Sequence, residues 1–263
     1  MRVSGCDVGS LTAKVVIINN NEIEAKVVLR CVSSPEKSAE SVMSQAVSQA
    51  GITLSDIDYI VGTGYGKERI SFANHTESEI NCHAQGVYSL LPEARTVIDI
   101  GGQDAKVVKI GDQGQINQYV YNDKCASGTG RFLEVMAEAL ELPIDMMSLY
   151  HEQAKEKLHI SNQCVIFAES EVVSLINEGK ETPDIICGLN TALAKRVSSL
   201  ARSIGIVPDV VFTGGVAKNS GVAKALEQSI GLPLTAYPLD PQISGAYGAA
   251  VLALKHLSVS KID

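Results

Sequence analysis

The stretch DVGSLTAKVVII, Asp7 to Ile18, returns with variation as DIGGQDAKVVKI, Asp99 to Ile110. Asp, Gly, Ala, Lys, Val, Val and Ile recur in register between the two copies. Each copy follows a short apolar run, makes an Asp-x-Gly turn and enters a segment rich in Val and Ile, which is typical of a β-hairpin. The repeat therefore predicts that the chain is built from two related halves.

The repeated turn has the chemistry of a phosphate site. Glycine allows close approach to the backbone, and successive amide groups in such a turn form a concave anion site. A carboxylate would repel phosphate unless a divalent cation lay between them, as Mg²⁺ often does. A single Asp-x-Gly is more simply an ordinary hairpin turn. Because Asp, Gly and Lys are all duplicated, we favour two turns that clamp one nucleotide.

Composition excludes several classes of protein. The 263 residues are 45% hydrophobic and 20% charged, and no apolar run approaches the ~20 residues needed to span a bilayer. With no apolar secretory signal at the N-terminus, we expect a cytoplasmic protein without membrane contact. The net charge of -8 argues against nucleic-acid binding. Six cysteines without CxxC spacing indicate neither a disulfide framework nor a self-contained zinc site.

Strands and helices are expected in the same order in both halves, which predicts an α/β protein with two mixed sheets around a central cleft. The domains are predicted as 1–94 plus 245–263 and as 95–244, with hinges at helical crossings in 77–90 and 245–254. The segment HEQAKEKLH, 151–159, is interpreted as a solvated helix face. The expected strands are 2–6, 14–19, 23–31, 59–61, 97–100, 105–110, 115–121 and 210–213, and the expected helices are 38–50, 130–142, 184–204, one after Asn219, and 244–256.

A third glycine-rich element, FTGGVAKN, 212–219, lies between an expected strand and an expected helix. With the two hairpins and the small-residue segment 245–250, it resembles the pattern of the acetate and sugar kinase, heat-shock ATPase and actin superfamily. That resemblance implies duplicated actin-like (ribonuclease H-like) domains with ATP or ADP in the cleft.

The resemblance also assigns roles to individual residues. Asp7 and Asp99 would organise Mg²⁺ and its waters, and Gln103 and Asp104 are candidates to orient the attacking water. Lys14 and Lys106 either touch phosphate or are solvated strand lysines, and both readings remain open. The other expected nucleotide-binding residues are Gly9, Ser10, Leu11, Thr12, Gly101 and Gly102 on the phosphates, and Gly214, Gly215, Val216, Lys218 and Asn219 on the adenosine.

Two cysteine segments have no use in a simple ATPase: NDKCASGTGRF around Cys125 and SNQCVIFAESEVV around Cys164. Each Cys precedes an expected helix, and Ser127 or Thr129 can cap the first of these helices and leave free amides directed at a ligand of Cys125. Thiolates near helix N-termini suit an anionic iron-sulfur cluster, which normally takes four Cys ligands. We therefore infer a two-fold dimer that shares one cluster. The alternative is a pair of inert buried thiols.

The motifs DIGGQDAK, NDKCASGTGRF and NQCVIFAESE resemble the activator, or component A, of 2-hydroxyacyl-CoA dehydratases. They also resemble the ATPase subunits of benzoyl-CoA reductases and the reductases of double-cubane cluster proteins. The resemblance implies a homodimer with one bridging 4Fe-4S cluster, held here by Cys125 and Cys164. It implies that ATP hydrolysis drives one low-potential electron into an acceptor dehydratase or reductase, with ferredoxin or flavodoxin as donor. Leu11 departs from the family, in which a small hydroxyl residue is more usual.

Two other functions compete with this interpretation. A small-molecule kinase shares the superfamily pattern, but it has no need of the two cysteine segments. A chaperone-like or filament-forming ATPase would bind peptides or polymerise and would carry no iron. The remaining cysteines, Cys6, Cys31, Cys82 and Cys187, are predicted to be core residues.

Overall fold

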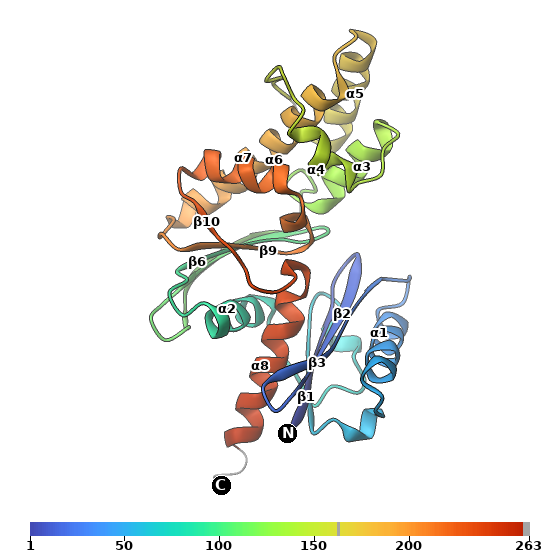
Figure 1. Ribbon diagram of the computed structural model, residues 1–263, viewed down its shortest axis with the longest axis vertical. Helices are drawn as coiled ribbons and strands as arrows, with labels where there is room; N and C mark the ends of the chain where they lie inside the picture. The colour runs from blue at the N-terminus through green and yellow to red at the C-terminus, as the bar shows by residue number, and fades with distance from the viewer. Residues whose placement is uncertain (162–163, 260–263) are drawn as a thin grey trace. The chain divides into compact units, whose positions relative to one another are not determined.

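The computed structural model describes residues 1–161 and 164–259. The backbone divides into two compact units (Figure 1). Unit 1 comprises residues 1–94, 110–117 and the C-terminal part from 237, and unit 2 comprises residues 95–109 and 118–236. One five-stranded mixed sheet has the order β3-β2-β1-β4-β5 and the other the order β10-β9-β6-β7-β8. The predicted fold class, a duplicated α/β fold with mixed sheets, is confirmed.

The elements occur in the expected order. The first sheet and its helices are β1 (Arg2–Val8), β2 (Thr12–Asn19), β3 (Glu22–Arg30), α1 (Pro35–Ala50), β4 (Tyr59–Thr63), β5 (His75–Thr76), α2 (Glu79–Leu90) and α8 (Ser244–Val259). The second sheet and its helices are β6 (Thr96–Ile100), β7 (Ala105–Ile110), β8 (Ile116–Asn122), α3 (Gly130–Ala139), α4 (Met146–His151), α5 (Val165–Asn177), α6 (Thr182–Ile204), β9 (Val210–Thr213), α7 (Ser220–Ile230) and β10 (Leu234–Thr235). Short 3₁₀ turns are η1 (Leu54–Asp56), η2 (Lys67–Arg69), η3 (Gly215–Lys218) and η4 (Pro241–Ile243).

The sequence repeat corresponds to a repeat in strand register. β1 and β2 form an antiparallel hairpin in which Asp7 lies opposite Lys14, and β6 and β7 pair Asp99 with Lys106 in the same way. Each first strand also pairs in parallel with a later strand, β1 with β4 and β6 with β9. The two sheets therefore share a frame of three strands that places an Asp at equivalent positions.

Side-chain alternation along the strands divides the core of unit 1 between two faces. Cys6, Val15 and Ile17 pack with α1 on one face. Val3 and Val16 pack with α8 on the other face, where α2 lies beside α8 (Figure 1). Ser34 caps α1 by accepting a hydrogen bond from the Lys37 amide, and Pro35 occupies the first turn, as its sequence predicts.

α8 packs so closely against its neighbours that side chains are excluded at two contacts. A methyl group at Gly248 would lie 1.7 Å from the Cys82 carbonyl oxygen of α2. One at Gly5 of β1 would lie 1.9 Å from the Ala246 carbonyl oxygen. Only glycine permits this approach of backbone to backbone, so both contacts depend on these two residues.

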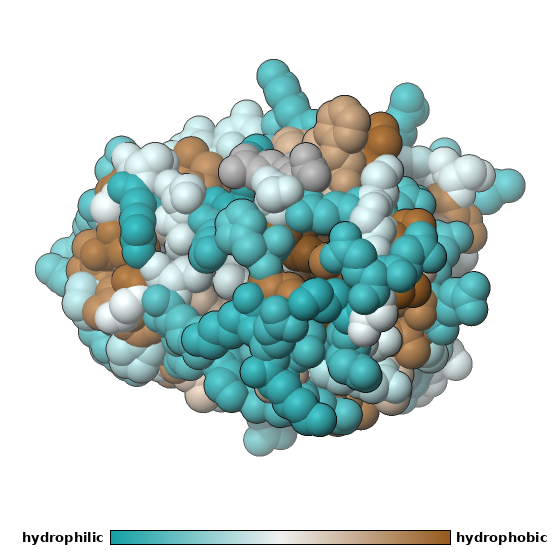
Figure 2. Space-filling model, turned by 90° about the horizontal axis from the view of Figure 1, so that it is seen from above, coloured by the Kyte–Doolittle hydropathy of each residue, from teal (hydrophilic) through white to brown (hydrophobic). Residues whose placement is uncertain are grey.

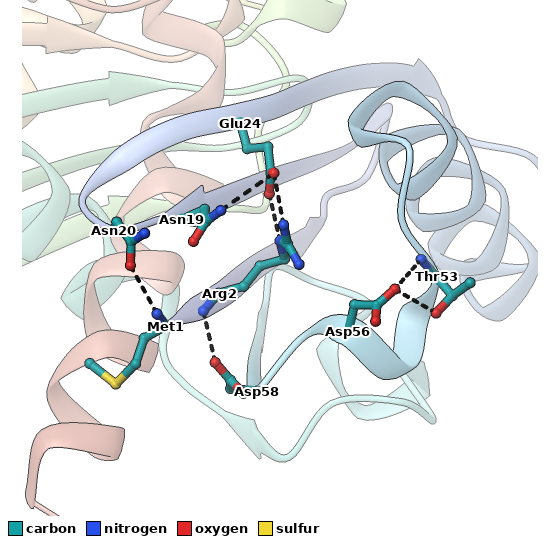
Figure 3. A network of polar contacts seen from close by, with 8 residues as sticks. All are labelled: Met1, Arg2, Asn19, Asn20, Glu24, Thr53, Asp56 and Asp58. Atoms are coloured by element: carbon teal, nitrogen blue, oxygen red, sulfur yellow. Dashed lines mark hydrogen bonds and ion pairs between the residues drawn. The ribbon is translucent and has the colours of Figure 1, made fainter.

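Polar contacts hold the end of β1 that lies away from Asp7 (Figure 3). The Arg2 guanidinium donates to both carboxylate oxygens of Glu24 on β3, at 2.6 and 2.9 Å. The Arg2 amide donates to Asp58 just before β4, at 2.8 Å. Nearby, the carboxylate of Asp56 accepts from the amide and hydroxyl of Thr53. β1 is thus fixed to strands on both sides.

In unit 2 the helices α6 and α7 pack beside β9 and β6 (Figure 1). Ile98 and Phe212 from the sheet join Leu189 of α6 and Leu226 of α7 in one buried cluster. Helix α3 belongs to the same cluster, with Phe132, Leu133 and Met136 fully buried. The helix that follows Cys125 is therefore part of the core of unit 2.

The expected helix over 151–159 is wrong. His151 ends α4, and the residues from 152 to 161 form turns and irregular structure. The buried carboxylate of Asp184 accepts hydrogen bonds from the amides of Lys155 and Glu156, at 2.6 and 2.9 Å. These tertiary bonds take up amides that a helix would use, and this overrides the local helical pattern.

No helix within residues 1–161 and 164–259 is long and apolar enough to cross a membrane.

We expect Gly248→Ala to destabilise the protein by about 2 kcal/mol or more, because the added methyl group collides with the backbone of α2. Helix propensity alone would stabilise the variant by about 1 kcal/mol, so the expected sign is the reverse of the intrinsic one. Urea unfolding followed by circular dichroism measures the difference. Ser44→Ala on the exposed face of α1 is the control and should stay within about 0.5 kcal/mol of the parent. Equal stabilities for the parent and Gly248→Ala would contradict the packing.

Candidate functional site

Both hairpin carboxylates are buried and held by lysines. Asp7 is 6% exposed and Asp99 is 2% exposed. Lys14 Nζ lies 3.1 Å from Asp7 Oδ2, and Lys106 Nζ lies 3.7 Å from Asp99 Oδ2. Buried carboxylates require such partners because leaving an ion unpaired in the interior is costly. The open alternative that these lysines are merely solvated strand residues is wrong, since each is largely buried and ion-paired.

The two turns have the same backbone bond but carry opposite charges. The Gly9 amide donates to the Thr12 carbonyl at 3.0 Å, and the Gly101 amide donates to the Asp104 carbonyl at 2.9 Å. A methyl group at Gly9 would lie 3.1 Å from Lys14 Nζ, so an ammonium group borders this turn. At Gly101 the same group would lie 2.4 Å from the Asp104 carboxylate. The first turn is therefore suited to an anion, and the second presents a carboxylate.

Asp104 is also paired with Lys106. Lys106 thus contacts two carboxylates, those of Asp99 and Asp104, and its charge is shared between them. Gln103 is exposed at the tip of this turn. The arrangement keeps Asp104 available at the turn to accept a hydrogen bond from water, which is the chemistry required for orienting a nucleophile.

The Gly214 loop follows β9 directly and lies against the second hairpin. Gly214 has a φ of +89°, and a methyl group there would lie 2.3 Å from the Ile100 carbonyl oxygen and 2.9 Å from Asp99 Oδ1. Thr213, the last residue of β9, donates its hydroxyl hydrogen to Asp99 Oδ1 at 2.8 Å. The loop is therefore built around the carboxylate.

Unit 1 contains a counterpart of this loop that sequence reasoning missed. Gly64 follows β4 with a φ of +94°, and a methyl group there would lie 2.4 Å from the Val8 carbonyl oxygen and 2.5 Å from Asp7 Oδ1. The signal was present in the sequence, because VGTGYGK, 61–67, shares Thr-Gly and a following Lys with VFTGGVAK, 211–218. Its weakness is that only a few residues are shared.

The other expected nucleotide residues lie on these loops. The Asn219 side chain caps α7, because its oxygen accepts from the amides of Gly221 and Val222 at 3.0 and 3.2 Å, and its amide group donates to Asn190 at 3.4 Å. Val216 is buried and Lys218 is exposed. The partly exposed remainder comprises Ser10, Leu11 and Thr12 in the first turn, Gly102 in the second turn, and Gly215 after β9.

Cys125 lies in a setting that favours the thiolate. Ser127 Oγ lies 3.0 Å from the Cys125 sulfur, and Asn122 brackets the residue by bonding to both its amide and its carbonyl group. Hydrogen bonds from the Ser127 hydroxyl and amide, and then the charge of Arg196, hold the pKa of the Cys125 thiol below its ordinary value. Low thiol pKa values are typical of reactive or metal-binding cysteines. Sequence reasoning missed Arg196, which lies on α6 and leaves no local pattern.

The capping expectation for α3 is partly wrong. Thr129 is at the N-cap position, but its hydroxyl donates to the Ala126 carbonyl at 2.7 Å and caps no amide. The first amides are also engaged: Gly130 donates to the Gly101 carbonyl at 2.9 Å, and Arg131 to the Gly102 carbonyl at 2.7 Å. The start of α3 is thus bonded directly to the second hairpin turn.

Cys164 is exposed at the N-cap position of α5, as its sequence predicts. Helix α5 packs against α3 through Ala168 and Val172 but also exposes apolar side chains. On the face seen in Figure 2, hydrophobic residues lie at the surface among hydrophilic ones. The exposed apolar residues of α5 are Ile166, Phe167, Val173 and Ile176, and Ile166 and Phe167 are 70% and 62% exposed. Across residues 1–161 and 164–259, no three His, Cys, Asp or Glu side chains converge to hold a metal ion.

With this geometry established, comparison with known proteins identifies the family. The sequence profile of the BadF/BadG/BcrA/BcrD ATPase family matches residues 4–253. The chain belongs to this family. The superfamily resemblance of the hairpins and the resemblance of the cysteine segments thus point to one and the same family of ATPases.

Several relatives within the BadF/BadG/BcrA/BcrD ATPase family are close. The activator of lactoyl-CoA dehydratase from Anaerotignum propionicum is 45% identical, covering 96% of this chain and 97% of that protein. A component polypeptide of benzoyl-CoA reductase from Thauera aromatica is 33% identical, covering 87% and 83%. The solved structure of the activator of the 2-hydroxyisocaproyl-CoA dehydratase from Clostridium difficile, with bound ADPNP, matches with a TM-score of 0.95 at 40% identity, covering 99% and 97%. The resemblance to dehydratase activators and to benzoyl-CoA reductase polypeptides is confirmed.

Because the pKa of the Cys125 thiol is lowered mainly by Ser127, we expect Ser127→Ala to raise it. Less thiolate is then present at neutral pH, so iodoacetamide should modify Cys125 of the metal-free protein more slowly at pH 7, by about twofold or more. The two rates should converge at a pH above both pKa values. Peptide mass spectrometry measures the rates. Ser170→Ala on α5 is the control, and an unchanged rate in Ser127→Ala would contradict the assignment.

Proposed function

We propose that this chain is an ATP-dependent one-electron donor that activates a partner iron-sulfur enzyme. Its acceptor would be a 2-hydroxyacyl-CoA dehydratase, an aromatic-CoA reductase or a double-cubane cluster protein, with reduced ferredoxin or flavodoxin as its own donor. The observation that carries the proposal is the pair of hydrogen bonds between the second hairpin turn and the start of α3, the helix that follows Cys125. A kinase or a chaperone has no use for a thiolate segment attached to its phosphate turn.

The nucleotide part of the proposal assigns the hairpins to Mg²⁺ and phosphate. Asp7 and Asp99 hold Mg²⁺ through its waters, as carboxylates commonly do. The Gly9 turn, bordered by Lys14, binds phosphate oxygens, and Asp104 or Gln103 orients the attacking water. The ADPNP bound by the Clostridium difficile activator supports nucleotide binding by a chain of this fold.

The cysteine part assigns Cys125 and Cys164 to a 4Fe-4S cluster. The residues fit such a group, because Cys125 is surrounded by donors that favour the thiolate and Cys164 is exposed at a helix N-cap. When bound, a 4Fe-4S cluster stores and releases a single electron at low potential. Four thiolates are the usual ligand set, so two copies of the chain are required.

The exposed apolar residues of α5 support a homodimer. Ile166, Phe167, Val173 and Ile176 lie exposed on the helix whose N-cap is Cys164. Contiguous apolar surface on a water-facing helix commonly marks an interaction site. A two-fold interface that includes this helix would bring the Cys164 residues of both copies to the same region.

Coupling follows from the backbone connection in unit 2. Any shift of the Gly101–Gly102 turn on nucleotide binding or hydrolysis is transmitted to α3 through the amides of Gly130 and Arg131. Gly130 also borders the Gly214 loop, since a methyl group there would lie 3.4 Å from Val216 Cγ2. The start of α3 thus responds to both nucleotide loops of unit 2. Moving the helix and its dipole changes the environment of the thiolate at Cys125, and with it the reduction potential of a bound cluster.

Anaerobically purified protein is expected to be brown and to contain about two iron and two sulfide per chain, since one 4Fe-4S cluster serves two copies. Cys125→Ser and Cys164→Ser should each lose most of the iron and the electron-paramagnetic-resonance signal of the reduced cluster. Cys187→Ser is the matched control and should retain both. Iron-free parent protein, or a Cys125→Ser/Cys164→Ser double variant that still carries the cluster, would refute the proposal and favour a redox-inactive ATPase.

Gly130→Val tests the coupling. Its branched side chain must push the Gly101 carbonyl away from α3, because a methyl group already lies 3.0 Å from that oxygen. We expect the variant to keep its iron but to lose most of the difference in midpoint potential between the ADP-bound and ATP-bound states. Gly128→Ala is the control, since its methyl group meets only the flexible Arg196 side chain. A full nucleotide-dependent shift in Gly130→Val would disprove this route of coupling.

A further inference from the structure

His83 is a buried residue of α2 that the proposed function leaves without a role. It is 6% exposed, and its Nδ1 lies 2.9 Å from Ser244 Oγ at the start of α8. Ser244 is itself 1% exposed, so the imidazole ring is held in a dry interior by a hydroxyl group from another helix. A buried polar pair of this kind constrains the ring orientation strongly.

The far side of the ring faces the Asp7 carboxylate across one glycine. A methyl group at Gly245 would lie 3.2 Å from His83 Nε2 and 2.9 Å from Asp7 Oδ2. Imidazole and carboxylate therefore border the same Cα atom, and the absent side chain leaves the space between them open. Asp7 Oδ2 is also the oxygen that accepts the hydrogen bond from Lys14.

The duplicated frame explains why unit 1 needs an additional residue here. In unit 2, the hydroxyl of Thr213 donates to Asp99 at 2.8 Å and fixes the carboxylate. The equivalent hydroxyl of Thr63 in unit 1 donates to the Glu77 carbonyl at 3.0 Å. Thr63 therefore does not restrain Asp7 as Thr213 restrains Asp99.

We propose that His83 is the positioning residue for Asp7, taking the part that Thr213 plays for Asp99. The Ser244 hydroxyl donates to Nδ1, which leaves the proton on Nε2, the ring atom that faces the carboxylate. This Nε2–H restrains the Asp7 carboxylate in the orientation that holds the waters of Mg²⁺. Groups behind metal-binding carboxylates commonly act in this way. The inference rests on the proposed role of Asp7 in Mg²⁺ binding.

Two substitutions separate the two ring nitrogens. His83→Gln carries an amide donor near the position of Nε2, whereas His83→Asn is shorter and carries its amide near Nδ1, within reach of Ser244. Mg²⁺ affinity is measured by calorimetric titration of the ADPNP-bound holoprotein, and the Mg²⁺ dependence of ATP hydrolysis is measured in parallel. Thermal unfolding is recorded for both variants.

We expect His83→Asn to weaken Mg²⁺ affinity by about tenfold, a usual effect of removing a group behind a metal ligand. His83→Gln should stay within about threefold of the parent, because it keeps the donor. Rates at saturating Mg²⁺ should be similar for both. Unchanged Mg²⁺ affinity in His83→Asn would overturn the inference. Equal losses in both variants at every Mg²⁺ concentration, with a lowered unfolding temperature, would also overturn it and assign His83 a packing role.

Asp7→Asn distinguishes failure of this inference from failure of the proposed function. Loss of Mg²⁺-dependent hydrolysis in Asp7→Asn, together with the expected Asn and Gln behaviour at position 83, supports both. If Asp7→Asn is inactive while both His83 variants match the parent, only the positioning role fails. If Asp7→Asn hydrolyses ATP with normal Mg²⁺ dependence, the proposed metal role fails and this inference fails with it.

Discussion

Two buried carboxylates impose the constraint on which the rest of the structure depends. Asp7 and Asp99 each lie near the end of a central strand, where an unpaired charge would be costly. A lysine directly opposite on the hairpin supplies the counter-charge in both units. A glycine with positive φ follows the neighbouring parallel strand, because any side chain there would strike the carboxylate or the adjoining carbonyl group. Asp, Lys and Gly are thus fixed together by one local requirement.

Within this shared frame the two units have diverged in what surrounds the carboxylate. In unit 1 an ammonium group borders the Gly9 turn, and His83 approaches Asp7 from α2. In unit 2 a carboxylate borders the Gly101 turn, and Thr213 donates to Asp99. Only unit 2 carries the cysteine segments, and its turn is bonded to the helix that follows Cys125. The divergence suits a division of labour in which one half contributes to binding and the other also transmits the state of the nucleotide.

Much of the fold could be predicted because it follows from local patterns. The hairpins at Asp7 and Asp99, the start of α1 at Ser34 and the helices after Cys125 and Cys164 all agree with the structure. The error at 151–159 arose where a distant group decides the outcome, since the Asp184 carboxylate binds the amides of Lys155 and Glu156. The free amides expected at the start of α3 were wrong for the same reason, because the hairpin turn accepts their hydrogen bonds.

By itself, the sequence determined the duplication, the order of strands and helices, and the residue types that nucleotide and thiolate chemistry would require. These follow from hydrophobic period, turn chemistry and repeated motifs, all of which act over a few neighbouring residues. Only the tertiary structure decided that Ser127 and Arg196 favour the Cys125 thiolate, that Thr63 repeats Thr213 in position but not in partner, and that Ser244 and His83 meet beside Asp7. Such contacts join residues far apart along the chain, and a hydrogen bond between distant side chains leaves no periodic trace in the sequence.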